Sequence, residues 1–216
     1  MRDYKIIIIG GGISGLSTGL AFSKLYNLNE TPALIIEKQK TIGGCVTTFA
    51  RDSYRFDTVQ IIPDVKNLLK FFDISTDLVK FDHNYANLYL VNSETESIET
   101  IPVAADEQNF QSYLCTRYQS DAKKIKKFFR YCNRMHSELK FLKTEPKILD
   151  IAKILIKCPK ILYNSSTTYK AFLKKFKFNN PEVYEVLDVF SSFSGLSGNR
   201  CAALLTACAM VTTLKG

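Results

Sequence analysis

Three glycines near the start of the chain have the spacing of a phosphate-binding turn. Gly10, Gly12 and Gly15 follow four consecutive isoleucines and precede apolar residues at helical spacing. The first glycine permits a tight turn, the second lets a pyrophosphate approach the backbone, and the third lets the helix pack closely. The N–H groups and dipole at the start of that helix favour an anion, so we expect a dinucleotide pyrophosphate here. The candidate contacts in this turn are Gly10, Gly11, Gly12, Ser14 and Gly15.

An acidic residue stands where a dinucleotide-binding unit needs one to hold a ribose. Glu37 ends a second apolar run, Ala33–Glu37, and lies 22 residues beyond Gly15. A carboxylate at this spacing accepts hydrogen bonds from ribose hydroxyls and disfavours a 2′-phosphate. The preceding strand, the helix and the acid together favour a dinucleotide site over a glycine-rich turn without a ligand. FAD and NAD share this pattern, so it leaves both open.

The glycine turn requires a strand before it and a helix after it, and the sequence supplies both. Four isoleucines make residues 5–9 an apolar run without alternation, which favours a central parallel strand buried on both faces. Ile13, Leu16 and Leu20 then repeat at helical spacing. With a second strand at 33–37, these elements predict a βαβ unit and an α/β fold with a Rossmann-like start.

A second glycine pair follows the acidic residue. Gly43 and Gly44 come shortly after it, with Thr47 close behind. At this point the chain resembles the FAD-dependent amine oxidase and phytoene desaturase superfamily, whose signature continues the βαβ unit with an acid, a Gly-Gly pair and a nearby Thr or Ser. Tyr54–Thr58 is similar to a strand of the same family. The resemblance implies FAD as the cofactor, with a flavin site lined by Gly43, Gly44, Cys45, Thr47 and Thr58.

Looser similarities later in the chain point to the carotenoid desaturase and isomerase branch, which includes retinol saturases. The similar segments are Pro63–Phe72, Thr167–Phe176, Phe193–Leu196 and Ala202–Leu205. This branch implies an apolar polyene as substrate, with a hydride moving between a polyene carbon and the flavin. Because the flavin carries that reaction, we predict no side chain as a catalytic acid or base.

The chain departs from the family pattern in three ways. Cys45 stands where the branch often has Arg, although retinol-saturase-like members resemble this sequence there, and Val59 replaces a common glycine. Family members are also longer, and their C-terminal half completes the FAD domain. We therefore expect an incomplete fold, a truncated product or fragment whose missing C-terminal half is a partner. Residues 1–85 would be the N-terminal part of the FAD-binding domain, and residues 86–216 part of a substrate or membrane-facing region.

The second region is expected to open with a β-hairpin and to continue as helices. Two strands at Leu88–Val91 and Ile98–Val103 flank a polar turn. Apolar residues at steps of three and four predict one amphipathic helix over 125–142. The further predictions are helices at 148–162 with a break at Pro159, at 167–176 capped by Ser165 or Ser166, from Pro181, and at 201–214, with a small-residue loop at 191–199.

Positive charge is concentrated in one segment. Residues 123–177 carry 16 Lys and Arg against three Asp and Glu, a net charge of +13 in a chain whose total is +8. This segment is either a solvated face or a surface for an anionic partner, of which a membrane surface is the candidate. Nucleic acid is not expected, because the aromatic residues lie on the apolar stripes instead of alternating with the charges.

The remaining composition is that of a globular protein, with 46% hydrophobic and 23% charged residues. The six cysteines form no CxxC pair and there are two histidines, so no metal site is expected. The sequence has no signal peptide and no run of the roughly 18 apolar residues that a membrane span needs, so we expect a cytoplasmic protein with reduced thiols.

Three functional hypotheses follow. The first is an FAD-dependent oxidoreductase acting on C–C bonds of a polyene. The second is a flavin-dependent amine oxidase, because the first 72 residues do not separate these two. The third is an inactive remnant, or a non-enzymatic binding module of the kind represented by the GDP-dissociation inhibitors, which share the fold without flavin chemistry.

Overall fold

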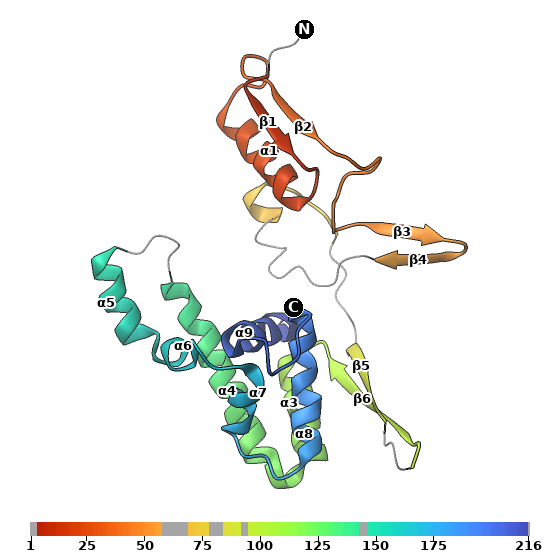
Figure 1. Ribbon diagram of the computed structural model, residues 1–216, viewed down its shortest axis with the longest axis vertical. Coiled ribbons are helices and arrows are strands. Elements are labelled where there is room, and N and C mark those ends of the chain that lie inside the picture. Colours follow the sequence, from red (N-terminus) through yellow and green to blue (C-terminus); the bar gives the residue numbers. More distant parts are fainter. Residues whose placement is uncertain (1–3, 58–68, 78–83, 92–94, 143–146, 216) are drawn as a thin grey trace. The chain divides into compact units, whose positions relative to one another are not determined.

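The computed structural model describes residues 4–57, 69–77, 84–91, 95–142 and 147–215 (Figure 1). The chain forms two compact units, Met1–Asp77 and Leu78–Gly216. The expected boundary at residue 85 falls inside a strand that pairs within the second unit. No helix in the described ranges has the length and apolar character to cross a bilayer.

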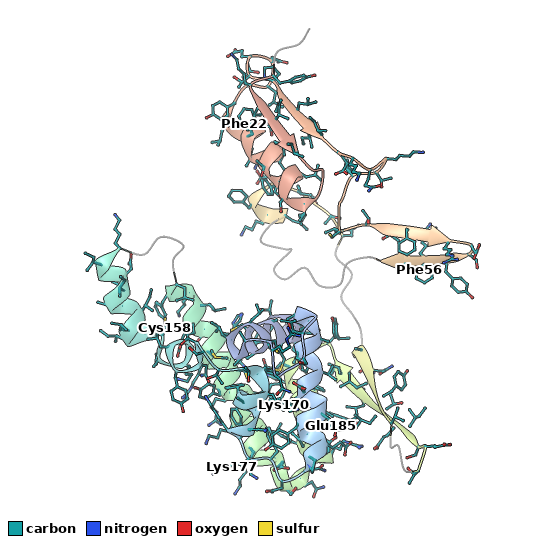
Figure 2. The ribbon with its side chains drawn as sticks, viewed as in Figure 1. Phe22, Phe56, Cys158, Lys170, Lys177 and Glu185 are labelled. Atoms are coloured by element: carbon teal, nitrogen blue, oxygen red, sulfur yellow. The ribbon has the colours of Figure 1, made fainter. Side chains whose placement is uncertain are left out.

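The first unit contains the predicted βαβ arrangement. β1 (Ile6–Ile9) and β2 (Ala33–Ile36) pair in parallel, with Ile6 opposite Ala33, and α1 (Ile13–Leu25) connects them. Two short antiparallel strands follow, β3 (Thr48–Arg51) and β4 (Tyr54–Asp57). Their aromatic residues Phe49 and Phe56 stack across the hairpin with ring centroids 5.3 Å apart (Figure 2).

The prediction that β1 is buried on both faces is wrong. Ile8 is 9% exposed, whereas Ile7 and Ile9 are 57% and 87% exposed. The cause is the two-stranded sheet: α1 covers one face, where Ile8 and Ile35 lie against the helix at Gly19, and the described residues leave the opposite face open. The isoleucine run therefore produces alternate burial, as in a sheet covered on one side.

The second unit is a β-hairpin followed by helices. β5 (Asn84–Val91) and β6 (Ile98–Ala104) are antiparallel, as predicted, and β5 begins four residues earlier than expected. The helices are α3 (Glu107–Arg117), α4 (Ala122–Glu138), α5 (Ile148–Lys157), α6 (Pro159–Asn164), α7 (Tyr169–Lys174), α8 (Pro181–Asp188) and α9 (Ala203–Lys215). Pro159 is the first residue of α6, which confirms the predicted break.

The core of the second unit is built around α4. The apolar stripe of this helix is fully buried, at Ile125, Phe128, Phe129, Cys132 and Met135. α9 packs against α4 and has small residues buried in the same core. The predicted stripe is therefore confirmed as a core face from Ile125 to Met135, which burial of apolar surface stabilises. The prediction of one helix to residue 142 is wrong, because α4 ends at Glu138, residues 139–141 form a 3₁₀ turn, and Leu142 is 39% exposed.

The N-caps of α7 and α8 are side chains that accept a hydrogen bond from a backbone N–H. α8 begins at Pro181, as predicted, and the side-chain oxygen of its N-cap Asn180 accepts from the Glu182 N–H at 2.9 Å. The prediction for α7 is wrong, because Thr168 is its N-cap and accepts from the Ala171 N–H. Ser165 instead ends α6, with its hydroxyl donating back to a carbonyl of that helix. Residues 189–194 form a 3₁₀ helix, which begins before the loop expected at 191–199 and extends into it.

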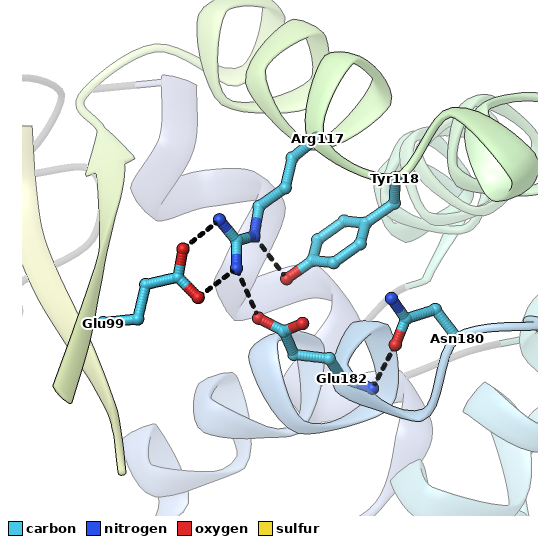
Figure 3. A network of polar contacts seen from close by, with 5 residues as sticks. All are labelled: Glu99, Arg117, Tyr118, Asn180 and Glu182. Carbon is cyan, nitrogen blue, oxygen red and sulfur yellow. Dashed lines mark hydrogen bonds and ion pairs between the residues drawn. The ribbon is translucent and has the colours of Figure 1, made fainter. Parts of the chain in front are cut away.

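Two polar groups tie the elements of this unit together. Arg117 on α3 donates both guanidinium arms to Glu99 on β6, at 2.6 and 2.5 Å, and a further N–H to Glu182 on α8 at 2.8 Å (Figure 3). The fully buried Asp121 accepts from the N–H groups of Asn179 and Asn180, at 2.8 to 2.9 Å. The hydrogen bonds of Arg117 and of Asp121 both join segments that are far apart in sequence, and they therefore stabilise the tertiary arrangement.

Candidate nucleotide-binding site

The first glycine of the turn has the backbone conformation that its predicted role requires. Gly10 has φ +102°, which side chains with a Cβ rarely adopt. Its N–H donates to the Ile36 carbonyl at 2.7 Å, so the turn is also bonded to the end of β2. This conformation places Gly12 as the N-cap of α1, directly after the turn.

The third glycine permits a close approach of the helix to the turn. A Cβ on Gly15 would lie 1.9 Å from the Gly10 carbonyl oxygen and 3.4 Å from Ile8 Cγ2. The tightest constraint is therefore the backbone of the turn, and the strand side chain comes second. The predicted close packing is present, but its main partner is the glycine turn and not the strand.

The start of α1 offers backbone donors to an anion. Along α1, which the structure describes in full, the N-cap Gly12 provides no side-chain cap and the first turn carries no acidic residue. The first N–H groups of a helix have no partner inside the helix and carry its partial positive charge. Ser14 lies in this first turn, where its carbonyl accepts from the Thr18 hydroxyl at 2.8 Å. The donors present thus fit a pyrophosphate.

The carboxylate predicted to accept from a ribose lies against the glycine turn. Oε2 of Glu37 accepts from the Gly11 N–H at 2.6 Å, and Oε1 accepts from the Gln39 N–H at 2.8 Å. These two backbone bonds, that of Gln39 first, lower the pKa of the Glu37 carboxyl below its ordinary value. The carboxylate is therefore ionised at neutral pH. Each oxygen keeps a further lone-pair position, which fits a pair of ribose hydroxyls.

The second glycine pair lies directly beside the first turn. The Gly43 N–H donates to the Gly11 carbonyl at 2.8 Å, and Gly12 and Gly43 form a parallel bridge. A Cβ on Gly44 would lie 3.0 Å from Gly12 Cα. Gly43 and Gly44 also have φ of +125° and +61°. The resemblance implied that Gly43 and Gly44 line a cofactor site, but their contact with the first glycine turn was not predicted.

The other predicted residues are placed less centrally. Thr47 donates its hydroxyl to the Gly44 carbonyl at 3.2 Å, and its methyl group would be 2.8 Å from a Cβ on Gly43, so it shapes this loop. Cys45 is exposed on the same loop. Thr58 lies outside the described residues. The structure therefore brings together residues 10–15, Glu37 and the 43–47 loop.

The described residues add no further chemistry to this unit. They contain no group of three or more His, Cys, Asp or Glu arranged for a metal ion. His136 lies in the other unit, where its Nε2 is 3.2 Å from the Thr212 hydroxyl between α4 and α9. Burial there lowers the pKa of the His136 imidazole. It belongs to the packing of α4 against α9.

Comparisons with known proteins agree with this description. Residues 8–73 match the family model of the NAD(P)-binding Rossmann-like domain. A crystal structure of an oxidoreductase from Methanosarcina mazei has a similar fold, with a TM-score of 0.55 and 13% sequence identity. The match covers 97% of this chain and 44% of that one, so the chain spans less than half the length of that protein. No curated protein gives a significant match.

These findings confirm the predicted fold class. The chain is an α/β protein with a Rossmann-like dinucleotide-binding unit followed by a helical region. The family model begins within β1 and covers the glycine turn, Glu37 and the 43–47 loop, which form the candidate site, and it continues past the β3–β4 hairpin.

Proposed function

We propose that this chain is the nucleotide-binding part of an FAD-dependent oxidoreductase. Residues 10–15 hold the pyrophosphate at the start of α1, and Glu37 accepts hydrogen bonds from the adenosine ribose. The observation that carries the proposal is the 2.6 Å hydrogen bond from the Gly11 N–H to Glu37, which holds this carboxylate beside the glycine turn and supports its role as the ribose acceptor. Both groups then contact one ADP moiety.

The 43–47 loop supports FAD over NAD(P). It lies against the phosphate turn through the Gly11–Gly43 hydrogen bond, where it would extend the contact surface along the dinucleotide. The resemblance of Gly43-Gly44 and Thr47 to the amine oxidase and phytoene desaturase signature supports FAD as the dinucleotide. The Glu37 carboxylate disfavours NADP, because its charge repels a 2′-phosphate.

The substrate proposal rests on the resemblance of the later segments to the carotenoid desaturases and isomerases. Bound flavin supplies the hydride acceptor or donor for a C–C bond of an apolar polyene. In this scheme the chain's own residues bind and orient the ADP half: α1 donates N–H groups to the phosphates, and Glu37 fixes the ribose.

Ligand binding to the purified chain tests the proposal. Isothermal titrations with FAD, ADP, NAD and NADP are expected to show binding of FAD and ADP, and weak or no binding of NADP. Glu37→Gln should weaken ADP binding about tenfold, since it removes a charged acceptor. Glu30→Gln, an exposed acid of the same unit, is the matched control and should bind as wild type. Binding of NAD in preference to FAD, or of no dinucleotide, would overturn the proposal.

A further inference from the structure

α5 differs from the helices around it in the exposure of its apolar side. Ile148, Ile151, Leu155 and Ile156 are 86%, 49%, 62% and 74% exposed. Their spacing of three, four and one residues places them on one side of the helix. Figure 1 shows α5 projecting from the helical body of the second unit. The hydrophobic surface of this helix is thus presented outward.

The opposite side of α5 is basic. Lys153 and Lys157 lie away from the exposed stripe by helical spacing, and Lys147 is the N-cap. Asp150 is the single acidic residue of α5, which the structure describes from end to end. Its side chain is 6% exposed and accepts from the Lys147 N–H, so it is turned inward. The outward charge of this helix is therefore positive.

The C-terminal end of α5 is fixed to the body of the unit. Cys158, labelled in Figure 2, is buried, and its thiol donates to the Glu138 carbonyl. The Glu138 carboxylate also accepts from the N–H groups of Lys160 and Ile161 at the start of α6. Ile154 packs against the core from the side of α5. These contacts hold the helix while its stripe stays exposed.

Of the helices α4 and α5 in the basic segment 123–177, α5 is the one that fits a membrane contact. The apolar stripe of α4 is fully buried, so α4 has no apolar side chain of that stripe to offer a bilayer. Lys124 of α4 is also engaged, because its ammonium donates to the Lys177 carbonyl and to Asn179. α5 combines exposed apolar residues with lysines.

We propose that α5 docks on the surface of an anionic phospholipid bilayer. Its exposed isoleucine and leucine side chains insert at the boundary of headgroups and acyl chains, and its lysines bind the anionic headgroups. An apolar face opposite a lysine face is the pattern of helices that lie in the membrane interface. The net charge of +13 over residues 123–177 complements an anionic surface. This inference is independent of the proposed function.

Vesicle flotation with the full chain tests the inference. We expect binding to phosphatidylcholine vesicles that contain phosphatidylserine, and little binding to phosphatidylcholine alone. Leu155→Gln with Ile156→Gln should lower the partition coefficient at least about tenfold, since each side chain loses its apolar transfer. Lys153→Gln with Lys157→Gln should lower it by about fivefold per lysine for anionic vesicles.

The matched control lies on the β-hairpin. Val91 and Ile98 pair across β5 and β6 and are 66% and 65% exposed, so Val91→Gln with Ile98→Gln removes similar apolar area. This control should bind as wild type, and circular dichroism should show that all variants fold. Equal binding to neutral and anionic vesicles would overturn the inference. Wild-type vesicle binding by the α5 variants would also overturn the inference. If these variants keep vesicle binding but turn a dimer into a monomer in light scattering, the stripe joins two copies of the chain instead.

Discussion

Gly15 offers the sharpest test of how the phosphate turn is positioned. The change is Gly15→Ala, whose Cβ would lie 1.9 Å from the Gly10 carbonyl oxygen and 3.0 Å from the carbonyl carbon. Both atoms belong to the backbone, so a change of rotamer relieves neither contact. Non-bonded heavy atoms prefer a separation of about 3.5 Å, so the helix and the turn must move apart by more than about 1 Å.

The expected cost follows from two opposing effects. Overpacking of this kind costs about 1–3 kcal/mol. Alanine in place of glycine in a helix recovers about 1 kcal/mol of that. The net loss in the free energy of unfolding of the first unit is therefore expected to be about 0–2 kcal/mol. Because the helix start is displaced from the turn, ADP affinity should also fall at least about tenfold.

Gly19→Ala is the matched control on the same helix. Its Cβ would lie 3.0 Å from Ile35 Cδ1, the end of a side chain that can move. It gains the same helix propensity, so its stability should equal or exceed that of wild type. Urea unfolding followed by circular dichroism, and calorimetric titration with ADP, measure both quantities. The reasoning is refuted if Gly15→Ala matches wild type in both, or if Gly19→Ala loses as much.

Three further predictions concern single carboxylates and their partners. ADP affinity should fall as the pH drops below the ordinary pKa of a glutamate. Because the pKa of Glu37 is lowered, its carboxylate is ionised and contributes to binding above that pH, and protonation at lower pH removes the contribution. Calorimetric titrations at two pH values should therefore differ for wild type and not for Glu37→Gln. Arg117→Lys should lower the free energy of unfolding in urea by about 1 kcal/mol, because a lysine cannot hold both Glu99 and Glu182, and Glu99 is partly solvated. Asp121→Ala should cost about 3 kcal/mol in the same assay, since it leaves two backbone N–H groups unpaired. Burial raises the pKa of Asp121, but these hydrogen bonds outweigh it and lower the value, so the stabilisation should be lost in acid, as pH falls through the lowered pKa.

The sequence alone determined the elements whose signals are local. The strand, glycine turn, helix and second strand of the first unit lie where spacing predicted them, because period, β-branching and turn chemistry act over a few residues. Asn180 with Pro181 likewise predicted the start of α8. In the candidate site, the sequence identified Gly10, Gly15 and Glu37 from spacing, and the structure describes all three in one unit.

Contacts between distant segments were decided by the tertiary structure. The hydrogen bond from Gly43 to Gly11 and the bond from Gly11 to Glu37 depend on how two loops meet at the end of the sheet, which no local pattern specifies. The helix α3 was not separately predicted, and its Arg117 is defined by partners on β6 and α8.

The same limit explains the two amphipathic helices. α4 and α5 show apolar residues at the same helical spacing, yet Phe128 is fully buried and Leu155 is 62% exposed. Periodicity in a sequence indicates that one side of a helix is apolar, but it does not predict what covers that side. The packing of α3 and α9 against α4 turned one stripe into core, whereas the stripe of α5 stayed at the surface.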